Sequence, residues 1–179
     1  MKRKYELKRR AERQAHTRER IVQAAVDVHS RVGPAAASIA AIAREAGVQR
    51  HTVYAHFPDE ETLFRACTLH WRAQHPFPDV SGLGLRQALE AVYGWYESVE
   101  DAFALFIRDA HMYPPFWAER QQMLASVVER LAAPYGRRKL VRAAVGHATA
   151  FETWRSLARG EGLSNAEAAR AMVAFVESV

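Results

Sequence analysis

Apolar residues recur along most of this chain at spacings of three and four positions, the period of one face of an α-helix. The first clear stripe spans residues 21–32 and ends at Gly33-Pro34. Thr17 precedes it as a candidate N-cap, although Arg20 stands where a capping box would have Glu or Gln. Alternating β-branched runs are missing. The pattern therefore predicts an all-α fold.

A shorter pattern at residues 38–57 predicts two helices joined by a tight turn. Ile42 and Ala43 lie on one face of the first helix, and Gly47 follows its last turn, where a positive φ favours glycine. Val53 then faces inward. The polar residues left on the open face of the second helix are Gln49, Arg50, His51, Thr52 and Tyr54. This is the helix-turn-helix pattern that places a helix in the DNA major groove, and a helical hairpin of another all-α domain is the alternative.

The remaining sequence also indicates helices, with one clear interruption. Pro58-Asp59 opens a fourth helix, and the proline- and glycine-containing residues 74–84 form a connector. Ser164 and Glu167 form a capping box for the last helix. Beyond the connector, helices are expected near residues 85–99, 101–112, 115–133, 136–160 and 165–178.

Positive charge is concentrated at the N-terminus. Residues 1–20 contain nine Lys or Arg and three Asp or Glu, so this arm carries more than the whole chain's net charge of +5. Its basic residues are Lys2, Arg3, Lys4, Lys8, Arg9, Arg10, Arg13, Arg18 and Arg20. A localised basic arm beside a helix-turn-helix predicts contact with phosphates, and a solvated tail without a partner is the alternative.

Composition and residue spacing also argue against several kinds of site and segment. Cys67 is the only cysteine, so no intramolecular disulfide is possible, and we expect it to be a small core residue. No run approaches the roughly 18 apolar residues of a membrane span, and no apolar stretch follows the basic N-terminus as in a signal peptide. No residues have the spacing of a metal site or of a catalytic motif. We therefore expect a cytoplasmic protein with no cofactor and no metal, which is not an enzyme.

Three motifs follow one another in the N-terminal half: Ile-Ala-x-x-Ala-Gly-Val at 42–48, Thr-Val-Tyr-x-His-Phe-Pro at 52–58 and Glu-x-Leu-Phe at 61–64. With Thr-Arg-Glu-Arg-Ile-Val-Gln-Ala-Ala at 17–25, they make the chain resemble the TetR family of transcriptional regulators over about residues 17–65. The resemblance implies a three-helix DNA-binding head and a helical body of about five to six helices. It also implies a homodimer that represses transcription until a small molecule binds. The expected domains are a basic arm (1–16), the DNA-binding domain (17–64) and an effector-binding and dimerisation domain (65–179).

The resemblance also assigns roles to residues. Those it assigns to DNA contact are Thr17, Ser38, Gln49, Arg50, His51, Thr52, Tyr54 and His56. The positive charge of the arm, and not the resemblance, adds Arg9, Arg10 and Arg13 to the expected DNA contacts. Thr17 and Ser38 match positions where helix starts meet phosphates, and Tyr54 and His56 match positions that hold the DNA backbone.

Two positions depart from the family pattern. A glycine is common where His51 stands, and a lysine is common where Glu60 stands, so a carboxylate there would repel a phosphate. The basic arm could offset this loss by following the DNA backbone or entering the minor groove.

The second half is rich in rings and sulfur, which suits a small-molecule site, although any one of these residues could be ordinary core. The candidate effector residues are Trp71, Trp95, Tyr96, Phe103, Phe106, His111, Phe116, Trp117, Met123, His147, Phe151 and Trp154. Tyr93, Arg108 and Glu152 are further polar candidates.

The last two expected helices carry faces that could pack against a second copy in an isologous four-helix contact. The candidate interface residues are Val141, Val145, Ala148, Glu152, Arg155, Ala168, Met172 and Phe175. Closing the monomer core is the alternative role for both helices.

Three functions remain open at this point. The first is a repressor that binds a palindrome-like DNA operator and is released by a small hydrophobic or aromatic effector. The second is an enzyme that happens to contain helical hairpins, against which the missing catalytic motifs argue. The third is a basic helical adaptor that binds acidic proteins or RNA without sequence preference.

Overall fold

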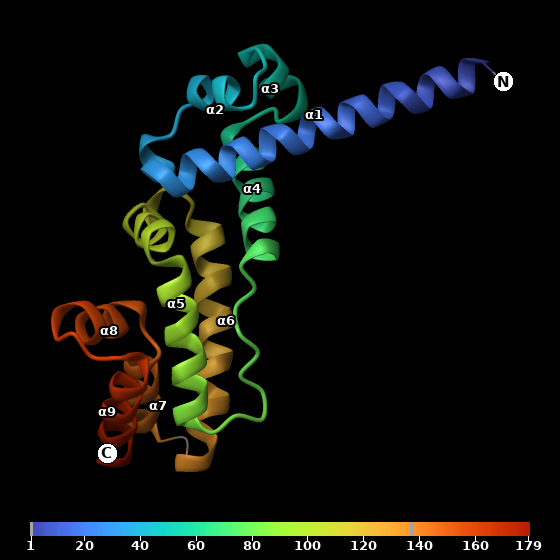
Figure 1. The fold of residues 1–179 in the computed structure, drawn as a ribbon. Helices are drawn as coiled ribbons and strands as arrows, with labels where there is room; N and C mark the ends of the chain where they lie inside the picture. The colour runs from blue at the N-terminus through green and yellow to red at the C-terminus, as the bar shows by residue number, and fades with distance from the viewer. Residues whose placement is uncertain (1, 137) are drawn as a thin grey trace. The chain divides into compact units, whose positions relative to one another are not determined.

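The computed structural model describes residues 2–136 and 138–179. The side chains of Lys2, Arg3 and Lys4, which belong to the basic arm, lie outside the described part of the chain. Over the described residues the chain forms helices and no strands, which confirms the all-α prediction (Figure 1). It divides into two compact units, Met1–Pro76 with Asp101–Tyr113 and Phe77–Glu100 with Pro114–Val179.

The first unit has a core between its longest helix and the three that follow. It contains α1 (Lys2–Val32), α2 (Ile39–Glu45), α3 (Arg50–His56), α4 (Glu60–Gln74) and the end of α5 (Leu85–Arg108). Ile21, Val53, Phe57 and Leu63 are at most 2% exposed, where α1 packs against α2 and α4. Burying an apolar side chain of this size contributes about 1.5–3 kcal/mol, so these residues anchor the short helices that could not persist alone.

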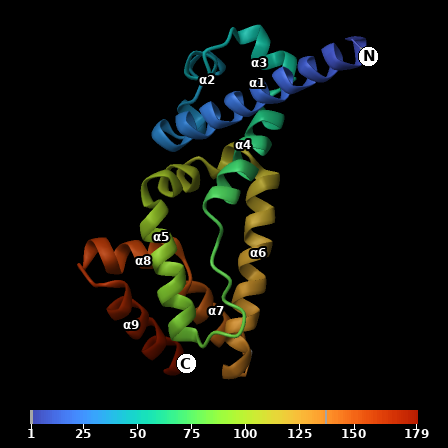
Figure 2. The same cartoon turned by 45° about the vertical axis from the view of Figure 1, so that its right-hand side comes forward.

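α1 begins at Lys2, about four turns earlier than the apolar stripe predicts. Thr17 lies inside this helix, where its hydroxyl donates to the Arg13 carbonyl over 2.9 Å, so the N-cap role is wrong. Residues 2–16 contain neither glycine nor proline to stop a helix, and Lys8 pairs with Glu12 one turn later over 3.9 Å. These turns project beyond the rest of the first unit (Figures 1 and 2).

The turn between α2 and α3 forms as expected from the sequence. Ser38 caps α2, because its hydroxyl accepts from the Ala41 amide over 3.2 Å. Gly47 adopts φ of +63°, and the Val48 amide donates to the Ala43 carbonyl over 2.9 Å. A side chain at position 47 would strain this conformation, so the glycine allows the chain to turn within so few residues.

The second unit is built from the first part of α5 and the remaining helices. They are α6 (Pro114–Ala132), α7 (Lys139–Ala148), α8 (Phe151–Arg155), a π-helical turn (Ser156–Gly160) and α9 (Asn165–Glu177). α7 packs against α6 and α9, and the largest buried side chains include Tyr93, Tyr96 and Trp154. The capping box of Ser164 and Glu167 at the start of α9 is confirmed. None of the helices in the described part of the chain combines the length and apolar character needed to cross a bilayer.

α5 runs without interruption from Leu85 to Arg108, so the break expected between residues 99 and 101 is wrong. Two adjacent acidic residues do not stop a helix, because each keeps the amide that the helical ladder needs. Glu100 instead accepts from Arg159 Nε over 2.8 Å, and Asp101 is exposed.

The single long helix expected over residues 136–160 is also wrong, because α7 ends at Ala148. The Tyr93 hydroxyl donates to the Ala148 carbonyl over 2.6 Å, and the Tyr96 hydroxyl donates to the Thr149 carbonyl over 2.8 Å. Burial raises the pKa of Tyr96 to about 12, so this hydroxyl keeps its proton. Side chains from α5 thus satisfy carbonyls that a continued helix would have paired.

Candidate nucleic-acid interface

α3 has one buried side and one polar side. Val53 and Phe57 are buried and fasten the helix to the first unit. The polar residues expected to contact DNA lie away from that core: Gln49, Arg50, His51 and Tyr54 are exposed, and Thr52 and His56 are half-buried. Tyr54 is 49% exposed although its ring is largely apolar. A short helix held from one side in this way leaves its donors and acceptors free for base edges and phosphates.

Two arginines counted with the basic arm hold the helix-turn-helix together. Arg20 donates to the Ala46 carbonyl and, over 3.5 Å, to the Gly47 carbonyl. The guanidinium of Arg18 lies 4.7 Å from the centroid of the Phe57 ring, a cation–π contact. The sequence does not predict this role directly, and its one signal is the position of Arg18 and Arg20 directly before the apolar stripe.

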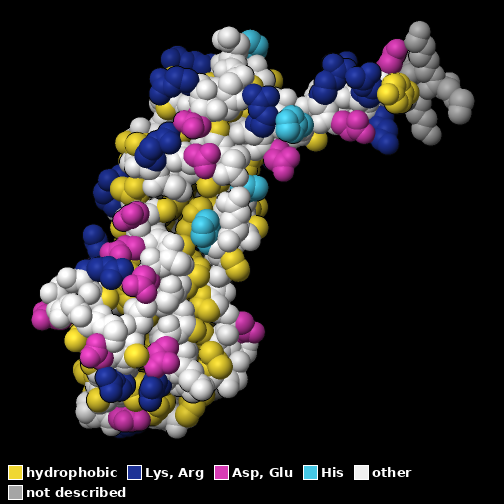
Figure 3. Space-filling model, in the orientation of Figure 1, with side chains coloured by type: hydrophobic (Ala, Val, Ile, Leu, Met, Phe, Trp, Pro, Cys, Tyr) yellow, Lys and Arg dark blue, Asp and Glu magenta, His cyan; other side chains and the backbone are white. Residues whose placement is uncertain are grey.

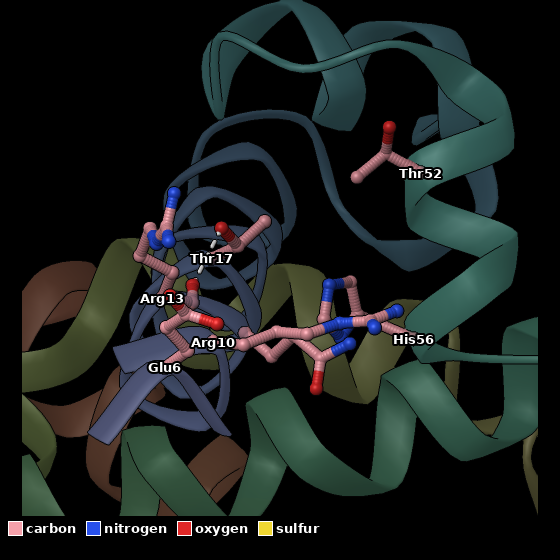
Figure 4. A pocket seen from close by; sticks show the side chains of 7 residues that line it. Glu6, Arg10, Arg13, Thr17, Thr52 and His56 are labelled. Carbon is pink, nitrogen blue, oxygen red and sulfur yellow. Dashed lines mark hydrogen bonds between the residues drawn. The ribbon is translucent and has the colours of Figure 1, made fainter. Parts of the chain in front are cut away.

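α1 and α3 together line a surface hollow of about 610 Å³. Its lining residues are Glu6, Arg10, Arg13, Gln14, Thr17, Thr52 and His56. In Figure 4, Arg10 and Arg13 project from α1, and Thr52 and His56 project from α3 around the same space. The structure therefore brings together five of the residues expected to contact DNA, although they come from positions up to 46 residues apart in sequence.

Lys8 and Arg9 also lie on exposed turns of α1. Arg9 lies 5.8 Å from the Tyr5 ring centroid, and its carbonyl accepts from Arg13 Nε over 3.3 Å. Lys8 is occupied by its ion pair with Glu12. The arm predicted from its charge is thus a regular helix, which sets the positions of Lys8, Arg9, Arg10 and Arg13 around its axis.

The start of α4 carries negative charge. Asp59 caps the helix by accepting from the Thr62 amide over 2.7 Å, and its hydrogen bonding with Thr62 holds the pKa of Asp59 below its ordinary value. Glu60 and Glu61 follow, both exposed. Carboxylates stabilise a helix N-terminus, but this end would repel a phosphate that approached it.

The interior of the first unit holds a neutral pair of titratable groups. His29 Nδ1 lies 3.3 Å from Cys67 Sγ. Burial lowers the pKa of His29 to about 4 and raises the pKa of the Cys67 thiol to about 12. Cys67 is buried, which confirms its expected core position. Among the described residues, no three His, Cys, Asp or Glu side chains gather as metal ligands.

The candidate effector residues are divided between the two units. Those of the first unit are Trp71, Phe103, Phe106 and His111. The Trp71 and Phe106 rings pack with centroids 5.8 Å apart, whereas His111 is exposed. Tyr113, which the sequence did not single out, stacks on Phe64 at 3.6 Å.

The second unit holds the other eight candidates: Trp95, Tyr96, Phe116, Trp117, Met123, His147, Phe151 and Trp154. Tyr96 packs against Phe151 at 5.2 Å and against Trp154 at 5.8 Å, and all three are buried. His147 is exposed beside Phe175, at 6.0 Å between ring centroids.

Arg120, which the sequence did not single out, is a basic residue among the rings of the second unit. Its guanidinium lies 4.9 Å from the Trp117 ring centroid. Burial lowers the pKa of Arg120, and its hydrogen bond with Tyr96 acts in the opposite direction.

The candidate dimer residues fall into two groups. Val141, Val145, Ala148 and Ala168 are buried within the second unit. Met172 is half-buried, and Glu152, Arg155 and Phe175 are exposed. Because α7 ends at Ala148, Glu152 and Arg155 belong to α8 and do not continue the face of Val141. Leu140 on α7 and Phe175 on α9 are 59% and 40% exposed, which leaves apolar area on both helices.

The end of α5 holds the junction between α1 and α2. Asp109 is buried and accepts from the Ala35 amide over 2.9 Å, and it pairs with Arg108 Nε over 2.7 Å. Arg108 Nη2 also donates to the Val32 carbonyl over 3.1 Å. Gly33 has φ of +86°, and a Cβ there would lie 2.5 Å from Asp109 Oδ2, so only glycine fits beside this pair.

Residues 21–67 match the family described as bacterial regulatory proteins, tetR family. No curated protein shows significant sequence similarity to the chain. Among solved structures, a TetR-like transcriptional regulator from Rhodococcus sp. RHA1 is 24% identical, with a TM-score of 0.65 over 89% of this chain and 93% of that one. A protein from Mesorhizobium loti MAFF303099, assigned to the TetR-family transcriptional regulators, is also 24% identical. Its TM-score is 0.57, over 93% of this chain and 96% of that one.

The two kinds of similarity cover different lengths of the molecule. The family match runs from the apolar stripe of α1 through α2 and α3 into α4, the helices that carry the polar side described above. The likeness to the two solved structures extends the shared fold over both units. Residues 21–67 thus match the TetR family of bacterial regulatory proteins, and the chain as a whole shares its fold with two solved structures of TetR-like regulators.

Proposed function

We propose that this protein is a homodimeric transcriptional repressor that binds a palindrome-like operator through α3. A small hydrophobic or aromatic effector would then release it from DNA. The observation that carries the proposal is the division of α3, where Val53 is fully buried while Arg50, His51 and Tyr54 are exposed beside a strongly basic helix. Helices of this kind read base edges from the major groove and hold phosphates at its rim.

The side chains of α3 suit different parts of a DNA site. Arg50, in the first turn, can make a bidentate contact with guanine, and Gln49 can do the same with adenine. Tyr54 and His56 lie further along and suit phosphate oxygens. His51 brings an imidazole where a glycine is common in the family, so this helix would approach the groove floor less closely or use the ring as a contact.

Sequence-specific DNA binding is tested by footprinting on the DNA upstream of the protein's own gene, with excess competitor DNA present. A repressor protects two related half-sites in palindromic order. The alternative, a basic adaptor without sequence preference, gives binding that competitor removes and that falls steeply with salt. A uniform footprint would refute the proposal.

Dimerisation is supported by the apolar area on the exposed sides of α7 and α9, where Leu140 and Phe175 project. A twofold axis would present two copies of α3 to half-sites one DNA turn apart, about 34–36 Å. Sedimentation equilibrium measures the mass directly. Leu140→Glu with Phe175→Glu should give monomers that keep their helical content, and an unchanged mass would place the interface elsewhere.

An aromatic effector is supported by the density of rings around Tyr96 and by Arg120 over Trp117. Ligand binding raises apparent thermal stability by mass action, so a thermal-shift screen of aromatic metabolites and drugs finds candidates. A true effector must also lower affinity for the footprinted DNA, because it has to favour the unbound form of the protein. A ligand that stabilises the protein without changing DNA affinity would contradict the release model.

A further inference from the structure

We propose that the N-terminal turns of α1, residues 2–16, are a second DNA-binding helix, and that the hollow between α1 and α3 holds a backbone phosphate. The inference rests on the proposed DNA binding. It adds DNA contacts from residues that precede the region matched by the family, which begins at residue 21. This phosphate would belong to the DNA strand that runs beside the bases contacted by α3.

The helical form of this segment creates the site. Glu6, Arg10, Arg13 and Thr17 are spaced by four, three and four residues, so they lie on one side of α1, which faces the hollow. A disordered arm would have no such side. Thr52 and His56, one turn apart on α3, form the opposite wall.

The lining is chemically suited to a phosphate. Arg10 and Arg13 bring two guanidinium groups, whose planar donors match phosphate oxygens, and the Thr52 hydroxyl, Gln14 amide and His56 ring add further donors. Glu6 is the one carboxylate among these lining residues. In the described part of the chain, the ion pairs leave Arg10 and Arg13 without a carboxylate partner, since Glu12 pairs with Lys8.

The charges extend beyond the hollow along the projecting turns. Figure 3 shows Lys and Arg side chains along this part of α1. Fifteen helical residues span about 22 Å, which is the length of about six steps of a DNA strand at 3.4 Å each. The extension is therefore long enough to follow the backbone past the bases that α3 can reach.

Its contribution should appear in the salt dependence of binding. Each phosphate that a cation neutralises adds about 0.9 to the magnitude of the slope of log K against log salt. Two contacts, from Arg10 and Arg13, therefore add about 1.8. Between 50 and 200 mM salt, the wild type should lose about 12-fold more affinity than a variant without both arginines.

The test compares Arg10→Gln with Arg13→Gln, singly and together, against Lys8→Gln. Lys8→Gln is a matched control, because it removes one charge from the same helix. Lys8 lies about 200° around the helix axis from Arg10. Binding is measured by fluorescence anisotropy at 50, 100 and 200 mM KCl. The probe is a 40-base-pair duplex carrying the footprinted site, and all variants are checked for unchanged helicity and melting temperature.

The expected result is a slope lowered by about 0.9 in each arginine variant and by about 1.8 in the double variant, with a smaller change for Lys8→Gln. An unchanged slope in the double variant, or equal changes in all three single variants, would overturn the inference. Equal affinity of the wild type for a single-stranded RNA of the same length would reassign the hollow to RNA. If the wild type showed no preference for any DNA site, the proposed function would fail instead.

Discussion

Replacing Asp109 by Asn tests how strongly the end of α5 holds the junction between α1 and α2. The carboxylate is 4% exposed, accepts from the Ala35 amide and pairs with Arg108, which in turn donates to the Val32 carbonyl. Asparagine keeps the shape and one acceptor but removes the charge. The side-chain NH2 of asparagine would also face either the Ala35 amide or Arg108, both of which donate hydrogen bonds to the carboxylate, so two donors would meet without an acceptor.

The size of the effect follows from these contacts. A hydrogen bond to a charged group contributes about 1.5–3 kcal/mol, whereas a neutral one contributes about 1 kcal/mol. Arg108 is 54% exposed, so water screens its charge and its hydrogen bonds to Asp109 count toward the lower end of this range. We therefore expect Asp109→Asn to lower the free energy of unfolding by about 2 kcal/mol. For a chain of this length, that corresponds to a melting temperature lower by about 4–8 °C.

The same change should depend on pH. The hydrogen bond from Arg108 is the main cause that holds the pKa of Asp109 below its ordinary value of 3.8. A carboxyl whose pKa is lowered by folding stabilises the protein above its unfolded pKa, and that contribution is lost as pH falls through the folded pKa. The difference between wild type and variant should be complete at pH 7 and shrink below about pH 3.8.

The measurement is thermal unfolding followed by circular dichroism at pH 7 and at several values below pH 4. Asp101→Asn is the matched control, since it removes an exposed carboxylate from α5, the helix that ends directly before Asp109. Equal melting temperatures for Asp109→Asn and the wild type at pH 7, or a difference that persists unchanged in acid, would refute the reasoning.

Further substitutions test the interface and the core. Arg50→Ala should cost about 1–3 kcal/mol of binding and relax preference at one operator position, whereas Tyr54→Phe should weaken all sequences about equally; titration against single-base operator variants separates them. A uniform loss from Arg50→Ala would assign Arg50 to the backbone. Glu60→Gln should raise DNA affinity roughly two- to fivefold at low salt, because it removes a repulsion worth a fraction of a kcal/mol, and unchanged affinity would place Glu60 away from phosphates. Tyr93→Phe leaves the Ala148 carbonyl unpaired and should cost about 1–3 kcal/mol in chemical denaturation, and a loss below about 0.5 kcal/mol would contradict that role.

The features predicted correctly are those decided by neighbouring residues. Ser38, Gly47 and Ser164 act within three or four positions of the backbone groups they serve, so their roles can be read locally. The end of α7 could not be read in this way. It depends on hydroxyls of Tyr93 and Tyr96, which lie more than 50 residues earlier in the chain.

The candidate site was only partly predictable for the same reason. The outward residues of α3 follow from the helical period, which also puts Val53 inside. The hollow depends on how far α1 extends, and Thr17 resembled a helix start because it stands just before the apolar stripe. The charges of Arg18 and Arg20 were counted correctly, but their partners Phe57 and Ala46 are set by tertiary packing.

The make-up of the first unit has a consequence for how the protein can be divided. A fragment ending at residue 76 would contain all four N-terminal helices but would lack Asp109 and Tyr113. Its Phe64 ring would lose a stacking partner, and the amide of Ala35 would lose its acceptor. The helices proposed to read DNA therefore do not form a contiguous module, since the interior of their unit is completed by residues 101–113, some thirty residues further along the chain.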